Sequence, residues 1–278
     1  MTDTFDPHYE TTRVTDADGL FRKLLAKRRL FPLIGEPYIG RRAKLAHFKR
    51  WLTRWMNGKT ERILEIGSGE GVFSFTAAQA MPQATVIGLE INQAEAVACQ
   101  KLAEYQRTTN LSFCSENLKS QRFQKHFDLI FCLDVFEHVH DDTELASEIG
   151  RCLRDGGSLL AHVPSRYWLD LNGQMQTVTD EEAWRINPGH VRNGYTPDEF
   201  KTMLTRAGFR NVEVVPASGR PIAKAYALFA KTEFSKLTRI LALPLLDHWI
   251  RQDLKTQPAH GNTLWAVASS YKEHGDNE

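Results

Sequence analysis

The sequence of 278 residues predicts an α/β fold in which a mostly parallel β-sheet presents a ligand site at the carboxyl ends of its strands. Short apolar segments typical of buried strands alternate with segments of helical periodicity between residues 62 and 163. A glycine-rich turn follows the first strand, and an acidic residue ends the second. A hydrophobic fraction of 42% with 25% charged residues is ordinary for a globular protein with a sizeable core.

The first strand and its turn lie in residues 62–75, RILEIGSGEGVFSF. An apolar run up to Ile66 predicts a buried strand, and a helix is expected from Val72 onward. The glycines between them let the backbone turn sharply and approach a ligand closely. Amide groups and a helix N-terminus then face that ligand. The second strand, residues 84–89, ends in Glu90, whose carboxylate can bind both hydroxyls of a ribose.

The spacing of the glycines separates two classes of nucleotide-binding turn. A nicotinamide dinucleotide fingerprint requires G-x-G-x-x-G, and its third glycine would fall on Val72. The sequence instead reads E-x-G-x-G-x-G from Glu65 to Gly71. This spacing, with the acid ending strand two, resembles the class I S-adenosylmethionine (SAM) methyltransferases. The resemblance covers about residues 45–215 and a last strand, and is to the small-molecule group of quinone and natural-product O-methyltransferases.

The resemblance implies SAM as cofactor and a Rossmann-like sheet of seven strands in the order 3-2-1-4-5-7-6, with strand seven antiparallel. The glycine turn would shape the methionine side of the site, Glu65 would support the loop or the amino group, and Glu90 would hold the ribose. A residue at the tip of strand three, Glu116 or Asn117, would contact the adenine ring; the alternative is a surface acid. The expected cofactor-binding residues are Glu65, Gly67, Ser68, Gly69, Gly71, Glu90, Ile91, Glu116, Asn117 and Leu133.

A second motif follows the fourth strand, which is expected over residues 127–133 and buried on both faces. Residues 134–139, DVFEHV, resemble the D-x-x-E-H-(V/I) segment of many small-molecule methyltransferases, where the end of strand four lies beside the transferable methyl group. His138 is a candidate general base, since histidine titrates near neutrality; the alternative is a histidine that only packs. Asp134, Glu137 and His138 could also hold a divalent ion, but we expect no metal.

Residues 164–195 are expected to form a long irregular segment over the strand ends. A loop of this length is more typical of a functional segment than of a simple connection. His190 is the second candidate base, with a packing role as its alternative. The helix after this segment begins at Thr196, because Pro197 and Glu199 complete a capping box. The residues expected to bind the acceptor are Arg166, Tyr167, Trp168 and Arg192.

Outside the core the sequence predicts several additions. Between residues 20 and 59 there are twelve Lys or Arg and one acid, in two amphipathic helices. Their charge predicts either a solvated helix face or a surface for anionic lipid, with non-specific nucleic acid less favoured. The expected organisation is a flexible arm (1–19), basic helices (20–58), a core (59–215), a helical insert or cap (216–262), a last strand (263–270) and a disordered tail (271–278).

The localisation and function follow from these features. The polar N-terminal segment does not resemble a secretory signal and the four cysteines form no C-x-x-C pair, so we expect a cytoplasmic protein, with peripheral contact at the inner membrane face as an alternative. We expect SAM-dependent O-methylation of a small-molecule, sugar or lipid-like acceptor. The alternatives are N- or C-methylation of another metabolite or of RNA, and a SAM-binding or membrane-associated regulatory protein without catalysis. The oligomeric state stays open.

Overall fold

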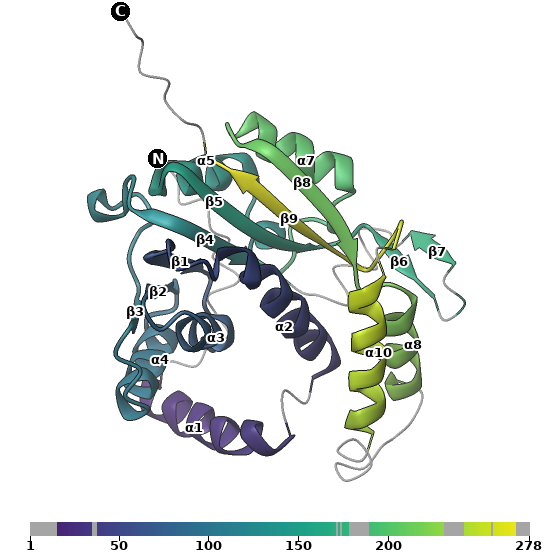
Figure 1. The fold of residues 1–278 in the computed structure, drawn as a ribbon, viewed down its shortest axis with the longest axis horizontal. Coiled ribbons are helices and arrows are strands. Elements are labelled where there is room, and N and C mark those ends of the chain that lie inside the picture. Colours follow the sequence, from purple (N-terminus) through teal and green to yellow (C-terminus); the bar gives the residue numbers. More distant parts are fainter. Residues whose placement is uncertain are drawn as a thin grey trace, which may run out of the picture.

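The computed structural model describes residues 16–34, 38–170, 172, 174–177, 189–230, 242–256 and 258–270. Its centre is a seven-stranded sheet in the order β3-β2-β1-β4-β5-β9-β8 (Figure 1). The predicted order is confirmed, because β8 and β9 are the expected strands six and seven, and β9 is antiparallel to both of its neighbours. Of the predicted flexible arm (1–19), residues 1–15 lie outside the described residues, whereas residues 17–19 form the first turn of a helix. The disordered-tail prediction for 271–278 also lies outside the described residues.

All seven residues of β4 are buried, as predicted for a strand that is covered on both faces. The sheet consists of β1 (Arg62–Ile66), β2 (Thr85–Leu89), β3 (Leu111–Cys114), β4 (Phe127–Leu133), β5 (Leu153–Pro164), β8 (Arg210–Ala217) and β9 (Thr263–Ser269). The parallel pairing of β1 with β2 and with β4 brings three carboxyl ends to one edge. A small separate hairpin of β6 (Tyr167–Leu169) and β7 (Met175–Thr177) lies within the segment expected to be irregular.

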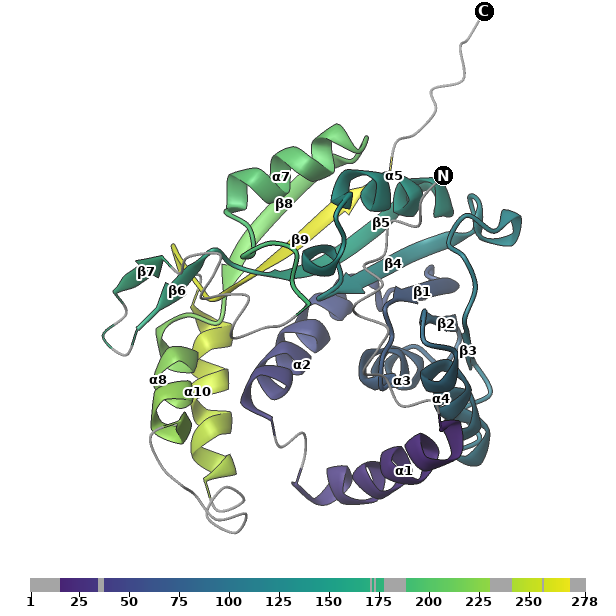
Figure 2. The ribbon, with the colours of Figure 1, turned by 180° about the vertical axis from the view of Figure 1, so that it is seen from behind.

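Helices cover both faces of the sheet (Figures 1 and 2). One face packs against α2 (Ile39–Leu52), α3 (Val72–Ala80) and α4 (Gln93–Tyr105), and α1 (Ala17–Ile34) packs on the outer side of α4. The other face packs against α5 (Asp142–Cys152) and α7 (Pro197–Arg206). The predicted start of α7 is confirmed, with both hydrogen bonds of the capping box present.

The expected insert contains two packed helices, α8 (Arg220–Ala230) and α10 (Leu243–Lys255), which share an apolar cluster with Ala43 of α2. The predicted continuation of this insert through residues 231–241 lies outside the described part of the chain. No described helix is long and apolar enough to cross a bilayer.

The glycines at positions 156 and 157 belong to β5 and do not cap the preceding helix. The helix α5 ends at Cys152, and β5 begins at once because Leu153 pairs with Phe127 of β4. Gly156, with φ of +74°, therefore lies within β5, near a shift of the β4–β5 register. Tertiary strand pairing here overrides the local signal of a glycine helix cap.

Candidate functional site

The turn between β1 and α3 is held in a conformation that its glycines permit. Gly67, Gly69 and Gly71 have φ values of +71°, +48° and +70°. A Cβ atom on Gly67 would lie 2.5 Å from a Val135 methyl group, and one on Gly71 would lie 2.8 Å from the Phe113 ring. Above Gly69 a Cβ atom would meet no atom within 4 Å. The outer two glycines are thus required by packing, and the middle one borders open space where a ligand can approach.

Glu90 connects the tip of β2 to this turn. Its buried carboxylate accepts hydrogen bonds from the main-chain N–H groups of Gly69, at 2.8 Å, and Asn92, at 3.0 Å. Each carboxylate oxygen has a further lone pair, so these bonds leave capacity for ligand hydroxyls. Ser68 is also buried, and its hydroxyl has no hydrogen-bond partner among the described residues. Ile91 beside it is half exposed, and Leu133 at the tip of β4 is buried.

Glu65 supports the turn from below. It is buried in β1 and accepts a hydrogen bond from the Ser74 hydroxyl of α3. Burial raises the pKa of Glu65 to about 8, so its carboxyl group is mostly protonated at neutral pH. Glu65 was expected either to support the loop or to bind the amino group of SAM, and its contact with Ser74 favours support of the loop.

The residues expected at the adenine ring engage other parts of the chain. Glu116 pairs with Arg122, at 2.7 Å between the carboxylate and Nε. The Asn117 side chain accepts a hydrogen bond from the Lys119 N–H at 2.8 Å and closes a local turn. Both lie after β3 at the edge that carries Glu90, and their contact with an adenine ring stays a prediction.

The N-terminal helices bind the glycine turn through Glu70. Its carboxylate pairs with Lys27 of α1 and, at 2.6 Å, with Arg41 of α2. Burial alone would raise the pKa of Glu70, but the hydrogen bond from Lys27 and the charges of Arg41 and Lys27 outweigh it and lower the pKa. The Arg28 guanidinium lies 4.2 Å from the centre of the Phe75 ring. Part of the basic charge of these helices therefore faces the protein and not the solvent.

The carboxyl end of β4 carries a strained acidic residue. Asp134 has φ of +57°, a left-handed conformation that is uncommon outside glycine. Its carboxylate lies 2.5 Å from Nδ1 of His162 in β5, and its N–H donates to the His162 carbonyl at 3.0 Å. Burial, with the charges of Lys44 and His47, lowers the pKa of His162 well below its usual value. His162 is therefore neutral and donates its Nδ1 proton to Asp134.

Lys44 is a residue of this site that sequence reasoning missed. Its ammonium group pairs with Asp134, although Lys44 belongs to α2, far from the strand-four motif in sequence. Burial lowers the pKa of Lys44 to about 8, while Glu137 opposes that effect. The sequence contained a signal that Lys44 is partly buried. Lys44 lies one helical turn before Phe48 and two turns before Leu52, and both of these residues are buried on the same face of α2.

The structure brings the two candidate bases together. The rings of His138 and His190 lie 4.7 Å apart between centroids, with an edge-to-face orientation. Nδ1 of His138 is 2.8 Å from the Gly189 carbonyl oxygen, so Nδ1 carries the proton of the neutral ring. Burial and the charge of His138 lower the pKa of His190 to about 4.

Glu137, His138 and His190 could hold a divalent metal ion. Their ligand atoms lie within 4.8 Å of one another, and one carboxylate with two imidazoles is a common donor set. Burial raises the pKa of Glu137 to about 7, and one of its carboxylate oxygens is buried without a hydrogen-bond partner in the described structure. The set differs from the triad considered from sequence, because Asp134 is engaged by Lys44 and His162. The absence of a metal stays a prediction.

The residues expected to bind the acceptor have different surroundings. Arg192 pairs with Asp142 and donates to the carbonyls of Val139 and His140, at 2.6 and 2.9 Å, so it fastens its own segment to the strand-four motif. Arg166 pairs with Glu199 at 2.6 Å. Tyr167 and Trp168 lie on β6, with the Trp168 side chain 37% exposed. Residues 178–188 of the same segment lie outside the described chain.

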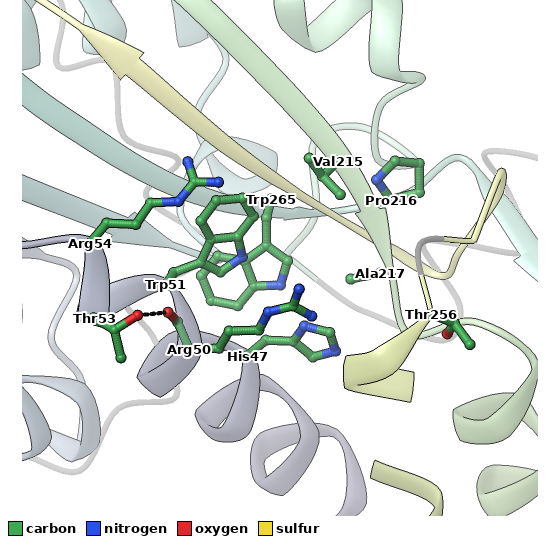
Figure 3. A pocket seen from close by; sticks show the side chains of 10 residues that line it. All are labelled: His47, Arg50, Trp51, Thr53, Arg54, Val215, Pro216, Ala217, Thr256 and Trp265. Carbon is green, nitrogen blue, oxygen red and sulfur yellow. Dashed lines mark hydrogen bonds between the residues drawn. The ribbon is translucent and has the colours of Figure 1, made fainter. Parts of the chain in front are cut away.

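A pocket of about 250 Å³ lies between α2, β8 and β9 (Figure 3). Its walls carry the two guanidinium groups of Arg50 and Arg54 and the indole ring of Trp51. The ring of Trp265 forms its inner wall and contacts His162, with centroids 4.7 Å apart. This pocket therefore lies next to the group formed by Asp134, His162 and Lys44, on the face of the sheet that α2 covers. It does not lie at the glycine turn.

Comparisons with known proteins agree with this geometry. The family described as "Methyltransferase domain" matches residues 39–214. The chain is 22% identical over 200 residues to a ubiquinone biosynthesis O-methyltransferase of Pseudomonas fluorescens, covering 69% of this chain and 82% of that protein. It is 25% identical over 202 residues to the Thiobacillus denitrificans protein of the same name, with 66% and 81% covered.

Solved structures share the fold. The phosphoethanolamine N-methyltransferase 2 of Haemonchus contortus, solved with SAM, matches with a TM-score of 0.62 and 17% identity. That match covers 98% of this chain, which spans about three fifths (61%) of the H. contortus chain. A putative sarcosine dimethylglycine methyltransferase of Galdieria sulphuraria matches with a TM-score of 0.53 and 13% identity, covering 83% and 86% of the two chains. With the family match over residues 39–214, the chain belongs to the methyltransferase-domain family and is a class I SAM-dependent methyltransferase.

Proposed function

We propose that the chain transfers the methyl group of SAM to an oxygen atom of a small-molecule acceptor, with His138 as the general base. The observation that carries this proposal is the hydrogen bond of His138 Nδ1 to the Gly189 carbonyl. This bond places the ring proton on Nδ1, so the lone pair of the neutral ring is on Nε2. In that tautomer Nε2 can take a proton from an acceptor hydroxyl.

The residues around the glycine turn fit SAM. The open space above Gly69, the unpartnered buried hydroxyl of Ser68 and the carboxylate of Glu90 together offer room, a donor and an acceptor at the carboxyl ends of β1 and β2. When bound, SAM supplies a methyl group on a sulfonium, which is its own leaving group. The protein then has to align the acceptor with that methyl group, exclude water and accept one proton. The O–CH₃ bond forms as the S–CH₃ bond breaks, and the hydroxyl proton passes to His138.

His190 is less suited to the same role. A pKa of about 4 makes His190 a weak base at neutral pH, although the same low pKa keeps the ring in its neutral form. We assign it to packing beside His138, and its substitution tests this. N- or C-methylation is the second candidate, since the named relatives include both O- and N-methyltransferases. The intact glycine turn and the Glu90 contacts favour an enzyme over a non-catalytic SAM-binding protein.

A lipid-like acceptor and contact with an anionic membrane have less support from the structure. The membrane hypothesis needs basic residues of α1 and α2 at the surface, yet Lys27, Arg41 and Lys44 pair with acids of the protein body. Apolar residues of the same helices pack into the core. A cytoplasmic location and a soluble small acceptor are therefore the simpler proposal.

The experiment is a turnover assay with SAM and matched sets of phenols, aliphatic alcohols and amines. S-adenosylhomocysteine (SAH) formation and the mass of the methylated product are measured. We expect hydroxyl acceptors to react, and His138→Ala to lower the rate by about a hundredfold or more without a change in SAM affinity. His190→Ala should retain most of the rate. His140→Ala, an exposed neighbour, serves as the control. Wild-type turnover by His138→Ala, or methylation of amines alone, would contradict the proposal.

A further inference from the structure

Lys44 brings a positive charge to the carboxyl end of β4, where its ammonium group pairs with Asp134. Its side chain is only 17% exposed. The residue belongs to α2, outside the glycine turn and the strand-four motif. Two neighbours in α2 pair with acids of other elements, Arg41 with Glu70 and Arg42 with Asp247 of α10. The packing of α2 therefore places the Lys44 ammonium group beside the carboxylate of Asp134.

The contacts around Asp134 hold its carboxylate in place. His162 binds it through Nδ1 at 2.5 Å and fixes its main chain through a carbonyl at 3.0 Å. An L-residue in the left-handed region is strained, and it persists there because the surrounding contacts impose it. Because His162 is neutral, Lys44 supplies the positive charge in direct contact with Asp134.

Other charged groups around Lys44 come from three elements. Glu137, which follows β4, attracts the ammonium group, and Arg41 on α2 repels it. His162 lies on β5, and its burial and the charge of Lys44 keep it neutral. His47 on α2 contacts Asp253 of α10 at 2.8 Å. The site thus contains two carboxyl groups from the strand-four segment. Lys44 pairs with Asp134, and both Lys44 and Arg192 act on Glu137.

We propose that Lys44 is a positioning residue that cancels the charge of Asp134 at the methyl-transfer edge, so that the site does not stabilise the SAM sulfonium more than the transition state. Ligands of open α/β sheets bind at the carboxyl ends of the strands, where Asp134 lies. The sulfonium loses its positive charge as the methyl group leaves. A carboxylate without a counter-charge would therefore stabilise the bound reactant more than the transition state, which lowers the rate. This inference rests on the proposed function.

The test compares SAM with SAH, which lacks the methyl group and the positive charge. Calorimetry gives the ratio of their affinities for the wild type, Lys44→Met, Asp134→Asn and the double variant. We expect Lys44→Met to raise the preference for SAM over SAH by roughly fivefold or more, because Asp134 becomes a free anion. Asp134→Asn should lower that preference, since Lys44 then lacks its partner. The double variant should return towards the wild-type ratio.

Kinetics and controls separate this role from a structural one. Lys44→Met should lower both kcat and the KM for SAM, whereas a poorly seated helix would raise KM. Lys44→Arg keeps the positive charge and should preserve the wild-type ratio of SAM to SAH affinity. Arg42→Met breaks the 2.6 Å pair with Asp247 on the same helix and should leave the ratio unchanged.

The outcomes distinguish this inference from the function on which it rests. An unchanged SAM-to-SAH ratio in both Lys44→Met and Asp134→Asn, or a shift of the same sign in both, would overturn the role of Lys44. If Lys44→Met does not fold, the sign of the Asp134→Asn shift decides. A wild-type protein that binds neither SAM nor SAH would instead contradict the proposed function.

Discussion

Arg41 of α2 lies 2.6 Å from the carboxylate of Glu70, which belongs to the glycine turn. Through this contact a helix that precedes the sheet in sequence is attached to the loop at which we propose that SAM binds. Lys27 of α1 pairs with the same carboxylate. The turn is therefore covered by two basic helices, and its position depends on how they are seated.

We expect Glu70→Gln to weaken SAM binding without unfolding the protein. Partly exposed ion pairs contribute up to about 1 kcal/mol each, so the loss of both corresponds to at most about a thirtyfold rise in Kd. Asp18→Asn is the control, because Asp18 pairs with Lys101 of α4 and attaches α1 to the body away from the turn. Calorimetry should show weaker SAM binding for Glu70→Gln and wild-type binding for Asp18→Asn. Equal affinities would show that the helices do not position the turn.

We expect Gly69→Ala to impair SAM binding more than its effect on stability explains. The methyl group would enter the open space above the turn, where no protein atom lies within 4 Å. Gly58 has φ of +75° and also borders open space, but it lies before β1 and away from the site. Both substitutions impose a left-handed alanine at a cost of about 1 kcal/mol. Thermal unfolding should therefore show similar losses, while the Kd for SAM should rise tenfold or more in Gly69→Ala alone.

We expect Glu90→Gln to lower SAM affinity by about tenfold or more, because a neutral amide is a weaker acceptor for ribose hydroxyls than a carboxylate. The substitution also weakens the bonds from the Gly69 and Asn92 N–H groups. Binding of SAM and SAH should fall together, since both contain the ribose. Retention of wild-type affinity for both ligands would place the ribose elsewhere.

The stability of the protein should depend on pH through Glu65. Its folded-state pKa of about 8 is above the ordinary value of 4.5, so the folded state retains a proton that the unfolded state has released. The stabilisation is complete below about pH 4.5 and is lost as pH rises towards 8. Glu65→Gln removes this pH-dependent loss. In urea unfolding, the stability of Glu65→Gln relative to wild type should therefore increase between pH 5 and 8, by about 3 to 4 kcal/mol. A difference that does not change with pH would mean that Glu65 is ionised in the folded protein.

The sequence by itself determined the features that depend on local chemistry. The glycines of the turn, Glu90 at the end of β2 and the capping box at Thr196 occupy short segments whose residue types restrict the backbone directly. The order of the seven strands followed from the family resemblance that these motifs carry, and the structure confirms it.

Only the tertiary structure decided which charged groups meet. Periodicity shows which face of α2 is buried, but it does not show that Lys44 contacts Asp134 or that Arg41 contacts Glu70. The same basic residues suggested a solvated face or a lipid surface when considered alone. Likewise, the contact between His138 and His190 depends on the path of a long loop over the strand ends. Such partners are set by how distant elements pack, because a charge acts on whatever group the fold places within a few ångströms of it.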